Sequence, residues 1–146
     1  MSGAICESYA VEAGAFGTAG EASGKIKGVL RKLGVPSALI RRVAVASYEV
    51  ELNLVIHSLG GTIDLSVEPG SVVLDVADRG PGIPDLALAM QEGWSTASDE
   101  VRMLGFGAGM GLPNMKRNAD EFAIQSEMGV GTRIHMRFRS PEGTGT

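Results

Sequence analysis

Two dense clusters of glycine constrain this chain more than any other feature of its sequence. The chain has 21 glycines among 146 residues, and many of them gather at positions 80–82 and 105–111. Glycine weakens helices and strands because its backbone loses the most conformational freedom on folding. Clusters of glycine therefore indicate either flexible loops or a backbone that must approach a ligand closely.

The length and composition predict one globular domain. A chain of 146 residues, 44% hydrophobic and 21% charged, is long enough to bury a single core and has the balance of a soluble protein. Aromatic residues make up only 5%, so the core is expected to be aliphatic. We expect residues 1–140 to form this domain and residues 141–146 to be a short disordered tail.

Several classes of partner are excluded by composition. The net charge is -4 and the basic residues form short clusters rather than a stripe, which argues against nucleic acid. The single cysteine, Cys6, cannot form an internal disulfide, and no Cys/His spacing is typical of a metal site. No apolar run approaches the roughly 20 residues of a membrane span, and no signal peptide is recognisable. The prediction is a cytoplasmic protein.

Hydrophobic periodicity predicts two helices in the first half of the chain. Apolar residues recur at helical spacing over Glu21–Leu33, and Gly34 is a plausible stop. A second helix runs from Ser37, interpreted as its N-cap, to about Ser58. It is apolar on two sides, with a second strip made of Val45, Leu52 and Ile56, which predicts that this helix is buried.

Strands and further helices complete the expected fold. Strands are predicted at Ile5–Ala13, Thr62–Val67, Ser71–Ala77, Phe122–Glu127 and Thr132–Arg139, and helices at Pro84–Gln91 and Asn114–Asp120. The Pro-Gly turn after residue 68 and the glycines near residue 130 predict hairpins. The order β-α-α-β-β-α-α-β-β favours an α/β (α+β) two-layer sandwich, with a mixed, mostly antiparallel sheet and helices on one face.

An acid and an amide share one edge of the long helix. Glu49 and Asn53 are four residues apart and His57 follows one turn later, whereas Glu51 points to a different azimuth. Polar groups beside an apolar face need polar partners. The pattern fits either a ligand site or a solvated helix edge, and for His57 packing is favoured over metal contact.

The first glycine cluster follows a strand that ends in a carboxylate. Asp78 precedes Gly80, Gly82 and Ile83. Its carboxylate could accept a hydrogen bond from the amino group of adenine, and the glycines would let the base approach the backbone. A tight turn is the alternative. A methyltransferase site for S-adenosylmethionine is another, but that fold needs more strand–helix units than the remaining chain offers.

The second cluster, Gly105 to Gly111, opens a predicted helix. Exposed N–H groups at such a helix start bind anions, and phosphate is the natural ligand. The Gly-Lys-Ser/Thr of a P-loop is missing, and a flexible surface loop is the alternative. At the last hairpin, Thr132 follows Gly129 and Gly131, and its hydroxyl could support the Asp78 carboxylate or a bridging water.

These motifs, in their order and spacing, resemble a known family. Glu49…Asn53, Asp78-x-Gly80-x-Gly82, Gly107-x-Gly109-x-Gly111-Leu112 and Gly129-x-Gly131-Thr132 resemble the four boxes of the GHKL ATPase superfamily, across roughly residues 37 to 139. DNA gyrase B, Hsp90, sensor histidine kinases and MutL belong to it. The small size and the runs 93–96 and 109–122 are similar to the serine/threonine kinases and anti-sigma factors of bacterial partner-switching systems.

The resemblance implies ATP, Mg²⁺ and a set of roles. Asp78 would hold the adenine, Asn53 would bind Mg²⁺ through its side-chain oxygen, and Glu49 would be the catalytic base. The implied ATP-binding residues are Asn53, Asp78, Gly80, Gly82, Ile83, Gly105, Gly107, Gly109, Gly111, Leu112 and Thr132. Phosphoryl transfer needs mainly positioning and charge neutralisation, which such a set provides.

The resemblance also implies a protein partner. Such kinases phosphorylate a serine or threonine of a small STAS-domain antagonist, some bind a sigma factor, and related anti-sigma factors form homodimers. Two alternatives stay open: a regulator that binds ATP without turnover, and the detached catalytic domain of a histidine kinase. One departure from the family is the stretch Ser98–Met103, which lengthens the segment before the glycine run and carries two acids.

Overall fold

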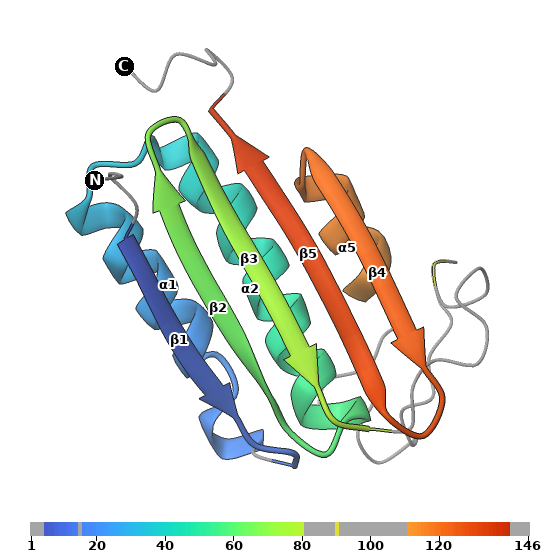
Figure 1. The fold of residues 1–146 in the computed structure, drawn as a ribbon. Coiled ribbons are helices and arrows are strands. Elements are labelled where there is room, and N and C mark those ends of the chain that lie inside the picture. Colours follow the sequence, from blue (N-terminus) through green and yellow to red (C-terminus); the bar gives the residue numbers. More distant parts are fainter. Residues whose placement is uncertain (1–4, 15, 81–89, 91–110, 141–146) are drawn as a thin grey trace.

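The fold was analysed in a computed structural model that describes residues 5–14, 16–80, 90 and 111–140. Its elements are β1 (Ile5–Val11), a 3-10 turn η1 (Phe16–Thr18), α1 (Glu21–Lys32), α2 (Ser37–His57), β2 (Gly61–Glu68), β3 (Ser71–Asp78), α5 (Gly111–Asn118), β4 (Glu121–Glu127) and β5 (Gly131–Arg139). The three α-helices lie on one face of the sheet (Figure 1). The two-layer sandwich is confirmed, while the helix predicted at 84–91 lies almost wholly outside the described residues.

The five strands form one sheet in the order β1-β2-β3-β5-β4. Every neighbouring pair is antiparallel, so the predicted hairpins β2–β3 and β4–β5 are confirmed. The strand β3 pairs with β2 on one side and with β5 on the other. The C-terminal end of β3 therefore lies between β2, which directly precedes it in the sequence, and β5, which comes from a distant part of the chain.

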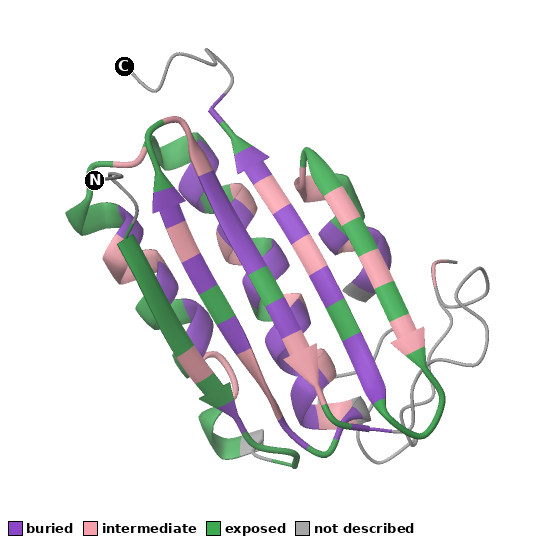
Figure 2. Ribbon diagram, viewed as in Figure 1, coloured by how far each residue is buried: buried purple, intermediate pink, exposed green. Residues whose placement is uncertain are grey.

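The core lies between this sheet and the helices. Buried residues alternate along β2 and along most of β5, as the colours in Figure 2 show, whereas β3 has three buried residues in a row, Val72, Val73 and Leu74. The residues of the inner strands that belong to the core cluster are Ile63, Leu65, Val67, Val72, Leu74, Val76, Ile134, Met136 and Phe138. Each such side chain contributes about 1.5–3 kcal/mol of burial free energy. The expected aliphatic core is confirmed, with Phe138 as its one buried aromatic among the described residues.

The helix α2 is the most buried helix, although one expectation about it is wrong. Val43, Val50 and Leu54 are at most 1% exposed against the sheet. Val45, predicted to belong to a second buried strip, is instead 38% exposed. The other two residues of that strip are covered, since Leu52 is 9% exposed and Ile56 packs partly buried against the core, so the expectation fails at Val45 alone.

The helix ends follow from local chemistry. Helix α1 ends as predicted at Gly34, which has φ +75°, and the N–H groups of Gly34 and Val35 donate to the carbonyls of Arg31 and Leu30. This is the Schellman arrangement. At the start of α2 the N-cap is Pro36 rather than Ser37, and no side chain caps the helix. The predicted serine cap is therefore wrong, because Ser37 already belongs to the first turn.

The guanidinium of Arg42 joins α2 to the connection between α5 and β4. Its Nη2 lies 2.8 Å from Asp120 Oδ2, and its Nε donates to the Asn118 carbonyl at 3.0 Å. The backbone N–H of Arg139 donates to the same Asp120 oxygen at 2.6 Å. Burial opposes ionisation of Asp120, but the Arg139 N–H and the Arg42 guanidinium outweigh it and lower the pKa of this carboxyl.

This lowered pKa makes a prediction about stability and pH. An acid whose pKa is lower in the folded state stabilises the fold above its unfolded pKa, about 3.9, and loses that contribution as pH falls through the folded value. Asp120→Asn is expected to lower the melting temperature at pH 7 and to have progressively less effect below about pH 4. Melting curves of both proteins from pH 7 to pH 3 measure this, and a constant difference across the range would contradict it.

Glycines inside α1 generate a second stability prediction. Gly24 and Gly28 lie in the helix, and a Cβ added at either position meets no atom within 4 Å. Glycine in a helix interior costs about 0.5–1 kcal/mol relative to alanine, so Gly24→Ala and Gly28→Ala are each expected to stabilise the protein by that amount. Gly34→Ala is the control, because its positive φ predicts destabilisation. Urea unfolding measures all three, and a loss of stability in either helix variant would refute the prediction.

Candidate functional site

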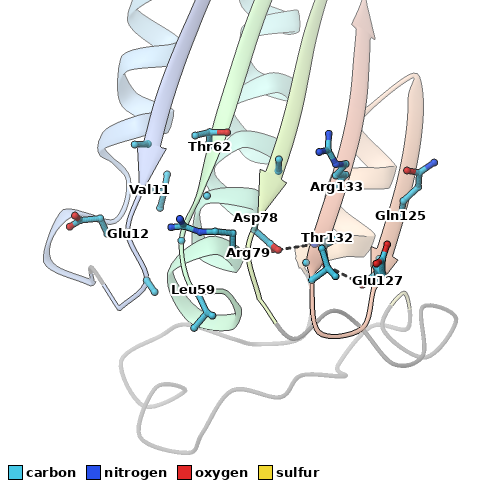
Figure 3. A pocket seen from close by; sticks show the side chains of 18 residues that line it. Val11, Glu12, Leu59, Thr62, Asp78, Arg79, Gln125, Glu127, Thr132 and Arg133 are labelled. Atoms are coloured by element: carbon cyan, nitrogen blue, oxygen red, sulfur yellow. Dashed lines mark hydrogen bonds between the residues drawn. The ribbon is translucent and has the colours of Figure 1, made fainter.

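The carboxylate of Asp78 stands at the C-terminal end of β3 and faces the start of β5. Its Oδ1 accepts the backbone N–H of Thr132 at 2.8 Å, a bond drawn in Figure 3. Burial raises the pKa of Asp78, and the Thr132 N–H opposes that rise. The result is a partly desolvated acid, held in one orientation, whose remaining lone pairs can accept a hydrogen bond from a ligand.

The absence of a side chain at Gly131 allows the start of β5 to lie close to Asp78. The φ of Gly131 is +155°, and a Cβ built there would overlap the carbonyl oxygen of Asp78 and lie 3.0 Å from Oδ1. Next to it, the N–H of Gly80 donates to the Val130 carbonyl at 3.1 Å. The two glycine motifs that are 50 residues apart in the sequence are thus joined backbone to backbone around Asp78.

A hollow of about 1080 Å³ lies at this end of the sheet. Figure 3 shows side chains from the ends of β1, β2, β3, β4 and β5 around it. Its labelled lining residues are Val11, Glu12, Leu59, Thr62, Asp78, Arg79, Gln125, Glu127, Thr132 and Arg133. The hollow has the size of a small-molecule site and combines apolar walls with a few charged groups.

The helix α2 passes close to the same end. A Cβ at Gly61 would lie 2.9 Å from both the Asp78 Cα and the Leu54 Cδ2. Leu54 of α2 and Asp78 of β3 therefore both approach the backbone of Gly61 closely. Asn53 and Glu49 precede Leu54 on the half-buried edge of α2. The side-chain amide of Asn114, on α5, donates from Nδ2 to Glu49 Oε2 at 3.0 Å. Glu49 therefore faces α5, and Asn53, four residues later, shares that edge.

Glu51 turns to the opposite flank of α2, as its azimuth predicts. It is 3% exposed, and its carboxylate accepts the N–H groups of Gly20, Ala22 and Ser23 at 3.0–3.2 Å. The N-cap of α1 is Gly20, which has no side chain to cap the helix. A carboxylate at a helix N-terminus satisfies free donors and meets the positive end of the dipole. Sequence reasoning missed this tertiary cap, although the uncapped start of α1 was a signal for it.

The remaining predicted site residues have mixed outcomes. Thr132 does support Asp78, but through its N–H, because its hydroxyl pairs instead with Ser126 Oγ at 3.1 Å. Gly111 begins α5, and the side chain of Leu112 packs into the core at 8% exposure. Gly82, Ile83, Gly105, Gly107, Gly109, the stretch 98–103 and the side chain of His57 lie outside the described part of the chain.

The described residues contain no group of three or more His, Cys, Asp or Glu residues arranged to hold a metal ion. Within these ranges no helix combines the length and apolarity that crossing a membrane requires.

An antiparallel sheet with helices on one face, and an acid at a strand end beside a glycine turn, define a two-layer α/β domain with a polar site at one end of its sheet. The family model described as histidine kinase-, DNA gyrase B-, and HSP90-like ATPase matches residues 40–142. The chain belongs to this family. The resemblance to GHKL ATPases is thereby confirmed, and the domain is an ATP-binding one.

The chain is also similar to individual proteins of known name. The chain is 33% identical to the serine/threonine-protein kinase RsbT of Bacillus subtilis (strain 168) over 112 residues, 74% of this chain and 78% of that protein. It is 31% identical to the anti-sigma F factor of Thermoanaerobacter sp. (strain X514) over 66% of this chain and 68% of that protein. The mycobacterial sensor histidine kinase MprB shares the fold, with a TM-score of 0.51 and 18% identity over 92% of this chain and 97% of that chain.

The contact around Gly131 generates a prediction about the site. Gly131→Ala combines a strained φ with an overlap against the Asp78 backbone, so a loss of about 2–4 kcal/mol in unfolding free energy is expected. Gly129→Ala is the matched control: its φ is +79°, but a Cβ there meets no atom within 4 Å, and a loss of about 1–2 kcal/mol is expected. Denaturant titration measures both, and equal losses would show that the close approach to Asp78 has no energetic weight.

Proposed function

We propose that this protein is a Mg²⁺-dependent serine/threonine kinase that transfers the γ-phosphate of ATP to a small STAS-type partner protein. One observation carries the proposal beyond ATP binding. Glu49 is a half-buried carboxylate on the edge of α2 that faces α5. It accepts a hydrogen bond from Asn114 and lies one helical turn from Asn53. Binding ATP alone needs no base, whereas transfer to a hydroxyl does. The identity to a serine/threonine-protein kinase supports the same reading.

In the proposed reaction the site residues have separate roles. Asp78 accepts a hydrogen bond from the adenine amino group, and the N–H groups at the start of α5, after the glycine run, face the phosphates. The partner's hydroxyl oxygen bonds to the γ-phosphorus while its proton passes to Glu49. The bond from phosphorus to the bridging oxygen breaks, and ADP leaves with the electron pair.

The donor set fits a magnesium ion that is bound mainly through the nucleotide. Asn53 offers an amide oxygen, a hard ligand, and the described residues hold no carboxylate cluster that would form a complete protein cage. Mg²⁺ commonly keeps several waters and binds through one or two protein oxygens plus substrate phosphates. Asn53 would hold the ion in that way, and the ion would neutralise charge on the phosphates.

A second candidate function is an ATP-dependent anti-sigma or protein-binding regulator without kinase turnover. The specific observation in its favour is the identity of 31–34% to several anti-sigma F factors. Both candidates need ATP and a protein partner, so they differ only in whether phosphate moves. The likeness to a histidine kinase domain, at 18% identity, is one of fold and supports no histidine-directed activity. A homodimer stays a prediction.

Nucleotide binding is tested with Asp78→Asn. The asparagine can still accept the Thr132 N–H and removes a partly buried charge, so the nucleotide-free variant is expected to melt no lower than wild type. Affinity for ADP is expected to fall by about 10–100-fold, since a lost hydrogen bond to a charged group costs about 1.5–3 kcal/mol. Asp75→Asn, three residues earlier on the open face of β3, is the control. Titration with a fluorescent ADP measures all three, and unchanged binding in Asp78→Asn would contradict the assignment.

Phosphate transfer is tested with Glu49→Gln. The assay incubates each protein with ATP labelled in the γ-phosphate, Mg²⁺ and purified STAS-domain proteins of the same genome. Transfer to a serine or threonine is expected for wild type and a loss of about 10²–10⁴-fold for the variant, with ADP affinity preserved. Glu68→Gln, at the far end of β2, is the control. Partner binding without transfer in wild type would replace the kinase by the regulator.

A further inference from the structure

We propose that Asn114 is a positioning residue for the kinase reaction, holding the Glu49 carboxylate in the orientation in which it accepts the proton of the attacking hydroxyl. The inference rests on the proposed function, because it assigns a role to the partner of the proposed base. It starts from one contact: Asn114 Nδ2 donates to Glu49 Oε2 at 3.0 Å across the interface between α5 and α2.

The orientation of the Asn114 amide is fixed by a second neighbour. Arg117 Nη1 lies 3.0 Å from Asn114 Oδ1, and a guanidinium can only donate hydrogen bonds. The amide oxygen therefore faces Arg117, and the NH₂ group faces Glu49. A reversed amide would place donor against donor on one side and oxygen against carboxylate on the other, so both contacts select the same state.

The backbone at Asn114 is also held in place by its neighbours on α5. Leu112 and Met115, which flank it on α5, are 8% and 0% exposed. The side chain of Asn118 donates to the Asn114 carbonyl at 2.8 Å. A side chain on a rigid, packed element positions its partner more precisely than one on a loop.

This arrangement constrains one oxygen of Glu49 and leaves the other for chemistry. Oε2 accepts the amide, and among the described residues Oε1 accepts no hydrogen bond. A carboxylate pinned at one oxygen loses rotational freedom, so the other oxygen stays aimed along one direction. Since α5 begins at Gly111, the last residue of the glycine run, one helix carries both the end of the proposed phosphate loop and the support of the base.

A double-mutant cycle tests the proposal in the full chain, with kcat and KM measured separately. Asn114→Ala is expected to lower kcat for phosphate transfer by about 10–100-fold and to change KM for ATP by less than about twofold. In a Glu49→Gln background the same substitution is expected to change kcat by less than about twofold, since the residue acts only through Glu49. Equal losses in both backgrounds would overturn the proposal.

A control variant and a spectroscopic readout complete the design. Lys116→Ala removes an exposed side chain of the same helix that is given no part in holding Asn114 or Glu49, and unchanged kcat is expected. The side-chain ¹⁵N–H signals of Asn114 are expected to shift in Glu49→Gln, as the acceptor loses its charge. Unshifted signals would refute the contact and with it the inference. Shifted signals with no transfer by wild type would instead refute the proposed kinase function.

Discussion

The packing of α2 against the middle of the sheet is the constraint on which the rest of the structure depends. Val43, Val50 and Leu54 cover the inner strands, so the rotation of the helix about its axis is fixed by burial. Residues two positions apart on a helix point about 200° apart. Glu49 and Glu51 must therefore lie on opposite flanks of α2, whatever their own preferences are.

Each flank uses its carboxylate differently. Glu51 is buried and anchors the N-terminus of α1 through three backbone N–H groups. Glu49 is half-buried and receives a single amide from α5. A buried carboxylate must have its acceptor sites filled, because an unsatisfied charge in the interior is costly. The acceptor sites of Glu51 are used by the N-terminus of α1, whereas Glu49 accepts one hydrogen bond among the described residues and can still accept another from a ligand.

Much of the fold could be predicted from the sequence because local periodicity determines it. The five strands and the helices α1, α2 and α5 lie within a few residues of their predicted ranges. The failures concern neighbours distant in the sequence. Val45 is apolar but 38% exposed, and the backbone N–H of Thr132, rather than its hydroxyl, donates to Asp78. A hydrophobic pattern shows which residues are apolar, but it does not show which of their side chains another element will bury.

The candidate site shows the same division between motif and context. Asp78 followed by glycines fits a plain turn equally well, and nothing in those residues selects an adenine site. The surroundings of Asp78 come from the sheet order, which places β5 rather than β4 beside β3. That order lets Gly131 admit the Asp78 backbone and directs the Thr132 N–H at the carboxylate. The pairing costs loop-closure entropy across more than 50 residues, and the burial of Ile134, Met136 and Phe138 beneath α2 and its neighbours offsets it. The hydrophobic core thus creates the polar site, because the strand that fills the core is also the strand that orients the acid.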